Sequence, residues 1–155
     1  MNELITSPVY HRFLPGGSRE QQAILIPALY ARQREKICIK FLPMRPNCGD
    51  VPRREEWNCY RSVLSVGWTD FQQLLSPAFE QVFPVADPTT GEMQEDFDPC
   101  FDNRIGRADW ARWLALLRAG LAGRTAEEWR FLAQVIGWVE TTLTHADVIV
   151  VEGNL

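Results

Sequence analysis

The chain has 155 residues, of which 46% are hydrophobic and 23% charged, as in a globular protein and unlike a disordered one. Its net charge of −4 disfavours a nucleic-acid-binding domain, which normally carries a basic face. A membrane span is not expected either, because the longest apolar run, Ala23 to Ala31, is short and contains Pro27. The length is close to the commonest domain size, so we predict one domain over residues 1–155.

The N-terminus and the cysteines favour a cytoplasmic protein without a bound cofactor. Met1-Asn2-Glu3 opens the chain without the basic and apolar regions of a secretory signal. No C-x-x-C pair occurs, and neither histidine stands at zinc-finger spacing from a cysteine. We therefore predict no metal site and four reduced, mostly buried thiols, those of Cys38, Cys48, Cys59 and Cys100.

The N-terminal part allows two interpretations. Ser18 to Gln21 fits a capping box that would open a helix toward Tyr30, whereas Ala23 to Ile26 also suits a strand. Apolar residues at 37, 39 and 41 alternate with polar ones and predict a half-buried strand. Pro43 to Pro52 holds three prolines and a glycine, which is typical of a loop.

The middle of the chain is less regular. Glu55 to Val66 suits either a helix or a strand. Thr69 or Asp70 is expected to cap a short helix through Leu75, with Phe71, Leu74 and Leu75 facing the core. Ser76-Pro77 either ends this helix or starts a new one, and the continuation carries Phe79, Val82 and Phe83. Pro84 to Asp109 is expected to be irregular.

The C-terminal third has the clearest pattern. From Ala108, apolar residues at 110, 113, 114, 117 and 121 form the stripe of an amphipathic helix, which glycines end. Thr125 to Glu128 is a capping box, and the helix it starts should run to about Thr144 with its apolar face formed by Trp129, Leu132, Val135, Ile136, Val139 and Leu143. Val148 to Val151 is a β-branched run typical of a strand buried on both faces. Together these elements predict an α+β fold, in which a small β-sheet packs with several amphipathic helices and the chain ends helix, helix, strand.

The segment from Asp87 to Asp109 carries most of the charge asymmetry. It holds seven acids and two bases, a net charge of −5 against −4 for the whole chain. Aromatic residues lie among the acids, and this combination suits a surface that attracts a basic partner and then packs against it. The predicted partner-binding residues are Glu92, Glu95, Asp96, Phe97, Asp98, Phe101 and Asp102. The alternative is a solvated loop whose Phe97, Phe101 and Ile105 fill the core.

The sequence gives weaker support to a catalytic function. Asp96-x-Asp98 begins like a calcium-binding EF-hand loop, but Phe101 and Arg107 stand where that loop needs glycine and glutamate. A magnesium or manganese site formed by Asp96, Asp98 and Asp102 is a second hypothesis, and a Cys59–His145 pair is a third. We predict no catalytic residue and no cofactor.

Small, acidic, tryptophan-rich α+β domains without catalytic motifs resemble the immunity proteins that bacteria keep against their own toxins. The resemblance concerns the general character of the whole chain. It implies an intracellular inhibitor that covers a cognate toxin, which would be basic if it is a nuclease. The alternatives are a small metal-dependent or Cys–His enzyme, and a structural or regulatory subunit whose homo-oligomer, such as a homodimer, is formed by Trp57, Trp68 and Met93.

Overall fold

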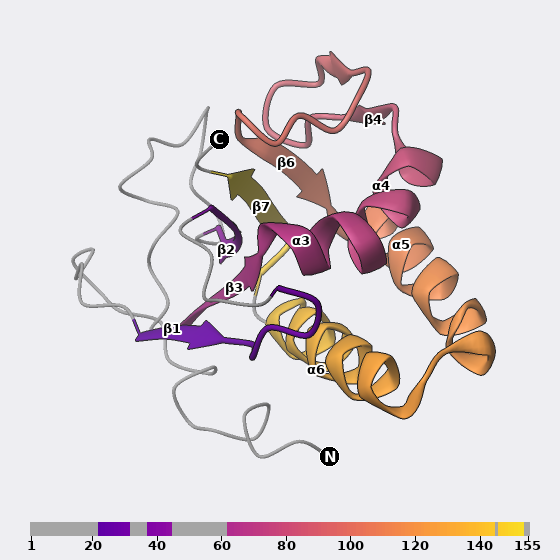
Figure 1. Ribbon diagram of the computed structural model, residues 1–155. Helices are drawn as coiled ribbons and strands as arrows, with labels where there is room; N and C mark the ends of the chain where they lie inside the picture. The colour runs from indigo at the N-terminus through magenta and orange to yellow at the C-terminus, as the bar shows by residue number, and fades with distance from the viewer. Residues whose placement is uncertain (1–21, 32–36, 45–61, 145, 154–155) are drawn as a thin grey trace.

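The computed structural model describes residues 22–31, 37–44, 62–144 and 146–153 and has an α+β fold. Its main sheet has five strands in the order β1-β3-β2-β7-β6 (Figure 1). The pair β1–β3 is parallel and the other three pairs are antiparallel. The strands are β1 (Gln22–Leu25), β2 (Cys38–Pro43), β3 (Ser62–Gly67), β6 (Asn103–Gly106) and β7 (Val148–Gly153).

The sheet decides two alternatives that the sequence left open. The strand interpretation of Ala23 to Ile26 is confirmed in β1, whereas residues 18–21 lie outside the described part. Within the ambiguous stretch from Glu55 to Val66, the described part belongs to strand β3, whereas residues 55–61 lie outside the described ranges. The prediction that 84–109 is irregular is wrong in part, because β6 forms one edge of the main sheet and β4 (Val85–Ala86) pairs with β5 (Met93–Gln94) in a small second sheet.

The helices lie in two groups. The first is continuous and comprises α3 (Trp68–Asp70), a π-helical turn (Phe71–Leu75) and α4 (Ser76–Val82). The second comprises α5 (Arg107–Ala119), a 3₁₀ turn (Leu121–Gly123) and α6 (Ala126–Thr142). No helix within the described ranges is long and apolar enough to cross a membrane.

Both helical groups cover the same face of the sheet. The ring of Phe41 on β2 lies 6.4 Å from that of Phe79 on α4, 5.8 Å from Trp110 on α5 and 6.3 Å from Trp138 on α6. All four side chains are at most 1% exposed. The main core is therefore an aromatic layer between β2 and the three helices, in agreement with the arrangement in Figure 1.

The π-helical turn explains how the first helical group keeps one face buried. Buried residues recur every four positions, at Phe71, Leu75 and Phe79. An α-helix has 3.6 residues per turn, so a repeat of four would rotate the apolar stripe by about 40° at each turn. The wider π turn at 71–75 offsets this drift. Of the two predicted caps, Thr69 and Asp70, the prediction for Asp70 is wrong, because its side chain makes no cap hydrogen bond. Asp70 is instead 1% exposed and accepts hydrogen bonds of 2.9 Å from the N–H groups of Leu29 and Tyr30.

The C-terminal elements confirm the prediction, with one correction on α6. Thr125 and Glu128 form the complete capping box, and residues 149–151 of β7 are fully buried. The predicted apolar face is confirmed except at Trp129, which is 49% exposed. Phe131 and Trp138, which were not predicted to lie on it, are buried as well. The buried stripe is centred on Val135, and Trp129 stands about 120° around the helix from it.

Candidate protein-binding surface

The segment from Asp87 to Asp109, which we call the acidic segment, is held by three anchors, and the first is Asp87 in the turn between β4 and β5. One carboxylate oxygen accepts hydrogen bonds from the N–H and hydroxyl of Thr89, at 2.8 and 2.6 Å. The other lies 3.1 Å from the Arg104 guanidinium on β6. Burial raises the pKa of the Asp87 carboxyl, but the Thr89 hydrogen bonds and the Arg104 cation outweigh this effect, and the pKa lies below its ordinary value. The positive φ of Gly91 (78°) completes the turn.

A second anchor attaches the small sheet to the main one. The Gln94 side-chain amide donates to the Arg104 carbonyl at 2.8 Å and accepts from the Arg104 N–H at 3.2 Å. Strand β6 is at the sheet edge, where backbone groups lack a neighbouring strand. Gln94 therefore satisfies part of that edge and holds β5 against it.

Asn103 is the third anchor and organises the 95–102 loop. Its side chain is almost fully buried and accepts from the Asp98 N–H at 2.9 Å. Its amide group donates to the carbonyls of Asp98, Phe101 and Val151. The Asp98 carboxylate in turn accepts from the Cys100 N–H at 2.8 Å. Asp98 therefore shapes the loop rather than standing free on the surface.

The predicted aromatic residues divide between core and surface. Phe97 stacks on Phe79 with ring centroids 4.7 Å apart and lies 5.4 Å from Phe71. Ile105 is 1% exposed, so these two residues fill the core as the solvated-loop alternative predicted. Phe101 does not: it is 70% exposed.

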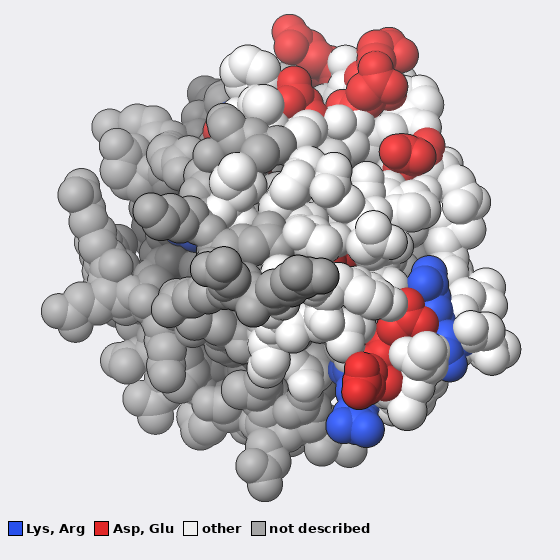
Figure 2. Space-filling model, in the orientation of Figure 1, with Lys and Arg blue, Asp and Glu red and all other residues white. Residues whose placement is uncertain are grey.

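The carboxylates exposed on this part of the molecule gather over the small sheet and α4. In Figure 2 the acidic side chains group at the top of the molecule, and no basic side chain of the described residues is seen among them. We call Glu80, Glu92, Glu95 and Asp96, with the exposed Met93, the acidic face. Within the described part of the chain, none of its four carboxylates has a hydrogen-bond or ion-pair partner.

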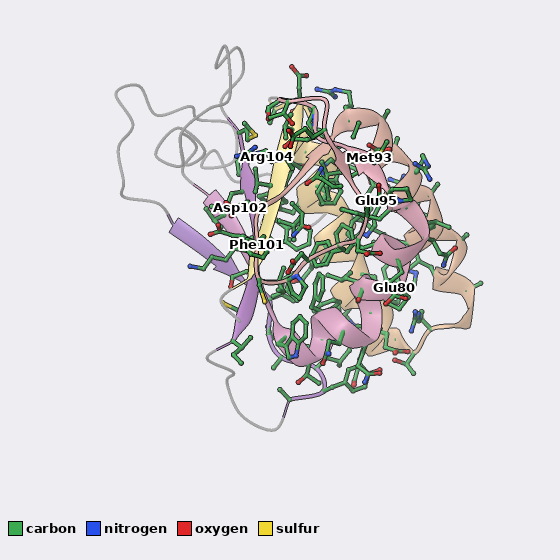
Figure 3. The ribbon with its side chains drawn as sticks, turned by 90° about the horizontal axis from the view of Figure 1, so that it is seen from above. Glu80, Met93, Glu95, Phe101, Asp102 and Arg104 are labelled. Atoms are coloured by element: carbon green, nitrogen blue, oxygen red, sulfur yellow. The ribbon has the colours of Figure 1, made fainter. Side chains whose placement is uncertain are left out.

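The predicted binding residues do not form one continuous patch. Seen from above in Figure 3, Met93, Glu95 and Glu80 lie on one side of the view, and Phe101 and Asp102 lie on the other. Asp87, which contributed to the charge count of the segment, is buried in its ion pair. The acidic face therefore contains Glu92, Glu95 and Asp96 of the predicted set but leaves Phe101 and Asp102 apart.

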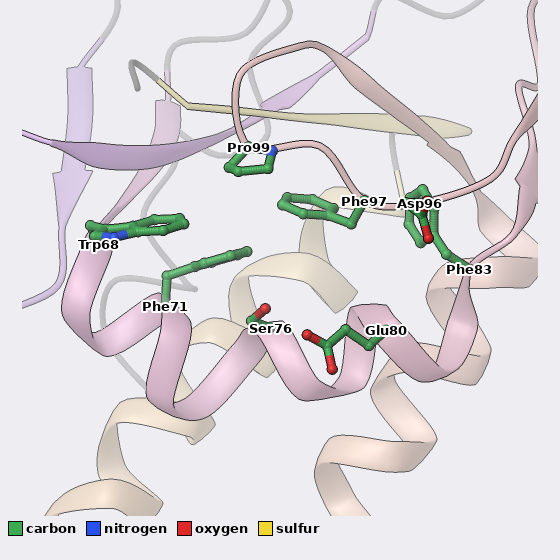
Figure 4. A pocket seen from close by; sticks show the side chains of 8 residues that line it. All are labelled: Trp68, Phe71, Ser76, Glu80, Phe83, Asp96, Phe97 and Pro99. Atoms are coloured by element: carbon green, nitrogen blue, oxygen red, sulfur yellow. The ribbon is translucent and has the colours of Figure 1, made fainter.

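Glu80 is a member of this surface that the sequence did not indicate. It is exposed on α4, before the acidic segment begins, and the predicted binding residues did not include it. It and Asp96 line a pocket of about 420 Å³ (Figure 4). We call this the aromatic pocket; its other lining residues are Trp68, Phe71, Ser76, Phe83, Phe97 and Pro99.

The catalytic hypotheses receive no support from the described residues. Asp96, Asp98 and Asp102 do not form a metal-holding group, and no such group of three or more His, Cys, Asp or Glu side chains occurs elsewhere in the described ranges. His145 and Cys59 lie outside those ranges. The expectation of mostly buried thiols is wrong for the two cysteines that are described, since Cys38 is half-buried and Cys100 exposed.

Comparison of the chain with protein-family models, with curated proteins and with solved structures found no match.

Proposed function

We propose that this protein is a protein-binding module that uses its acidic face to bind a basic partner, as the inhibitor of a cognate toxin. The observation that carries the proposal is a set of exposed, unpaired carboxylates on an ordered frame, with an exposed apolar side chain close to two of them in the sequence. Glu92 and Glu95 flank Met93, which is 57% exposed. Long-range attraction between such a face and a basic protein speeds encounter, and an apolar contact beside the charges supplies affinity.

The anchoring of the acidic segment supports this use. Asp87, Gln94 and Asn103 tie its turn and loop to the main sheet. A surface that is ordered before binding loses little conformational entropy on association. The same carboxylates on a flexible chain would bind with a larger entropic cost.

Genetic rescue tests the proposal. Each protein encoded beside the gene of this chain is expressed in bacteria with and without this chain. We expect one neighbour to stop growth and this chain to restore it. Reversing Glu92 and Glu95 to lysine should abolish the rescue, because it places like charges against the basic partner. The control makes the same change of charge at Glu127 and Glu140, two exposed residues of α6 on the opposite side of the molecule from β4 (Figure 1). Because Glu140 pairs with Arg118, the stability of this control variant is measured as well.

Three results would contradict the proposal. The first is that no neighbouring product is toxic. The second is that the Glu92, Glu95 double reversal protects as well as the natural chain. The third is that both double reversals lose protection equally, which would assign the effect to total charge rather than to the acidic face. Thermal unfolding of each variant shows whether the double reversals keep the fold.

A further inference from the structure

The aromatic pocket combines apolar walls with two carboxylates from different elements. Trp68 and Phe71, from the first helical group, stack with their ring centroids 5.8 Å apart and their planes 16° from parallel. Phe97 and Pro99 come from the 95–102 loop, and Phe83 stands 5.8 Å from Phe97, edge to face. The pocket is thus formed where the loop passes over the helix, as Figure 4 shows.

The two carboxylates give the pocket a negative charge that nothing in its lining offsets. Glu80 is on α4 and Asp96 on the loop, and the eight lining residues include no lysine or arginine. Both carboxylates are exposed and have no ionic partner in the described part of the chain. In Figure 4 the Glu80 carboxylate reaches along the helix toward Ser76, over the floor of the pocket. A cation at this place would meet opposite charge from two sides.

The walls favour an organic cation over a metal ion. Calcium and magnesium require several oxygen ligands at close range, and no such cluster occurs among the described residues. Aromatic walls instead suit a cation that carries hydrocarbon, through cation–π attraction and burial of its methylene groups. Arginine suits this pocket better than lysine, because its planar guanidinium is more weakly hydrated, packs on aromatic rings and pairs with carboxylates.

We infer that the aromatic pocket receives an arginine side chain of the partner protein, with its stem against Trp68 and Phe97 and its guanidinium between Glu80 and Asp96. This inference rests on the proposed function, since it assigns one anchor residue to the basic partner. The pocket volume of about 420 Å³ leaves room for flanking peptide besides the side chain. Arginine is among the residues that most often supply binding energy at the centre of an interface.

A titration with small probes tests the pocket without the partner. N-acetyl-arginine N-methylamide is added to the ¹⁵N-labelled protein, and the indole N–H signal of Trp68 is followed by NMR. We expect a saturable shift. The citrulline analogue has nearly the same shape without the charge and should bind at least tenfold more weakly. The Glu80→Gln, Asp96→Asn double variant should lose at least tenfold in affinity for the arginine probe, whereas Glu127→Gln, Glu140→Gln should not.

Other outcomes would overturn the inference. Equal binding of the arginine and citrulline probes would mean that charge plays no part. Absence of a saturable Trp68 shift would mean that the pocket does not hold arginine. Binding of free L-arginine a hundredfold tighter than the blocked probe would identify a small-molecule site, because an arginine within a protein lacks the free α-amino and carboxylate groups.

The two proposals can fail separately. If the arginine probe does not bind but reversal of Glu92 and Glu95 still abolishes protection, the pocket assignment is wrong and the protein-binding function stands. If the probe binds as expected but no neighbouring protein is neutralised, the pocket recognises arginine and the toxin-inhibitor role is wrong.

Discussion

Replacing Gly153 by alanine is expected to destabilise the protein and to move one wall of the aromatic pocket. Gly153 ends β7, where the 95–102 loop passes closely over the strand. A β-carbon added there would lie 2.3 Å from the Pro99 carbonyl oxygen and 2.7 Å from the Ile39 side chain. Ile39 is fully buried, and the Pro99 atom belongs to the backbone. The loop therefore has to move by about 1 Å to restore ordinary contact, and overpacking of this kind costs about 1–3 kcal/mol.

Urea unfolding measures this cost. The Gly153→Ala variant should show a lower midpoint at unchanged slope, because the native state is strained while the surface exposed on unfolding stays the same. In thermal unfolding the loss corresponds to about 2–4 °C for each kcal/mol in a chain of this size. Because Pro99 lines the pocket, binding of the arginine probe should also weaken.

Gly123→Ala is the matched control for that substitution. An added β-carbon at Gly123 meets no atom within 4 Å, and its φ is not in the left-handed region. This change should leave stability unaltered or raise it slightly, by about 0.4–1 kcal/mol, through the unfolded state. A Gly153→Ala variant as stable as the Gly123→Ala variant would refute the close approach of the loop to β7.

Two further predictions concern stability alone. Trp110→Phe should lower the free energy of unfolding by about 1 kcal/mol more than Trp113→Phe does. The reason is that the Trp110 indole donates to the Ile105 carbonyl at 3.0 Å, whereas the Trp113 indole has no acceptor among the described residues. Equal losses of stability in urea unfolding would contradict this prediction. The lowered pKa of Asp87 means that its charged form stabilises the fold above the ordinary aspartate pKa of about 3.9, and that this contribution is lost as the pH falls further, through the lowered value. Asp87→Asn should therefore reduce the stability measured at pH 7 and flatten the decline of stability in acid. An identical decline in the variant would show that the charge of Asp87, with its Thr89 hydrogen bonds and its Arg104 pair, contributes nothing to stability.

The C-terminal elements could be predicted because their causes are local. The Thr125 hydroxyl and the Glu128 N–H are three residues apart, so the capping box is contained within one turn of chain. The β-branched run before Glu152 requires burial on both faces wherever the strand is placed. Neither inference depended on knowing which elements would become neighbours.

The local sequence pattern was not sufficient to predict the buried face of every helix. The apolar residues of α6 allow more than one stripe, and the packing of Phe131 and Trp138 against the core selected the one that leaves Trp129 exposed. The π turn at 71–75 is a similar case. The repeat of four in its buried residues is visible only once their burial is known.

The acidic face and the aromatic pocket were likewise predictable from the sequence only in part. The sequence by itself determined that the segment from Asp87 to Asp109 concentrates negative charge and mixes it with aromatic residues. Only the tertiary structure decided which of those charges remain available, because it paired Asp87 with Arg104. It also brought Glu80 to the same pocket as Asp96. Charge content follows from composition, whereas the position of a charge relative to another depends on contacts between residues far apart in the chain.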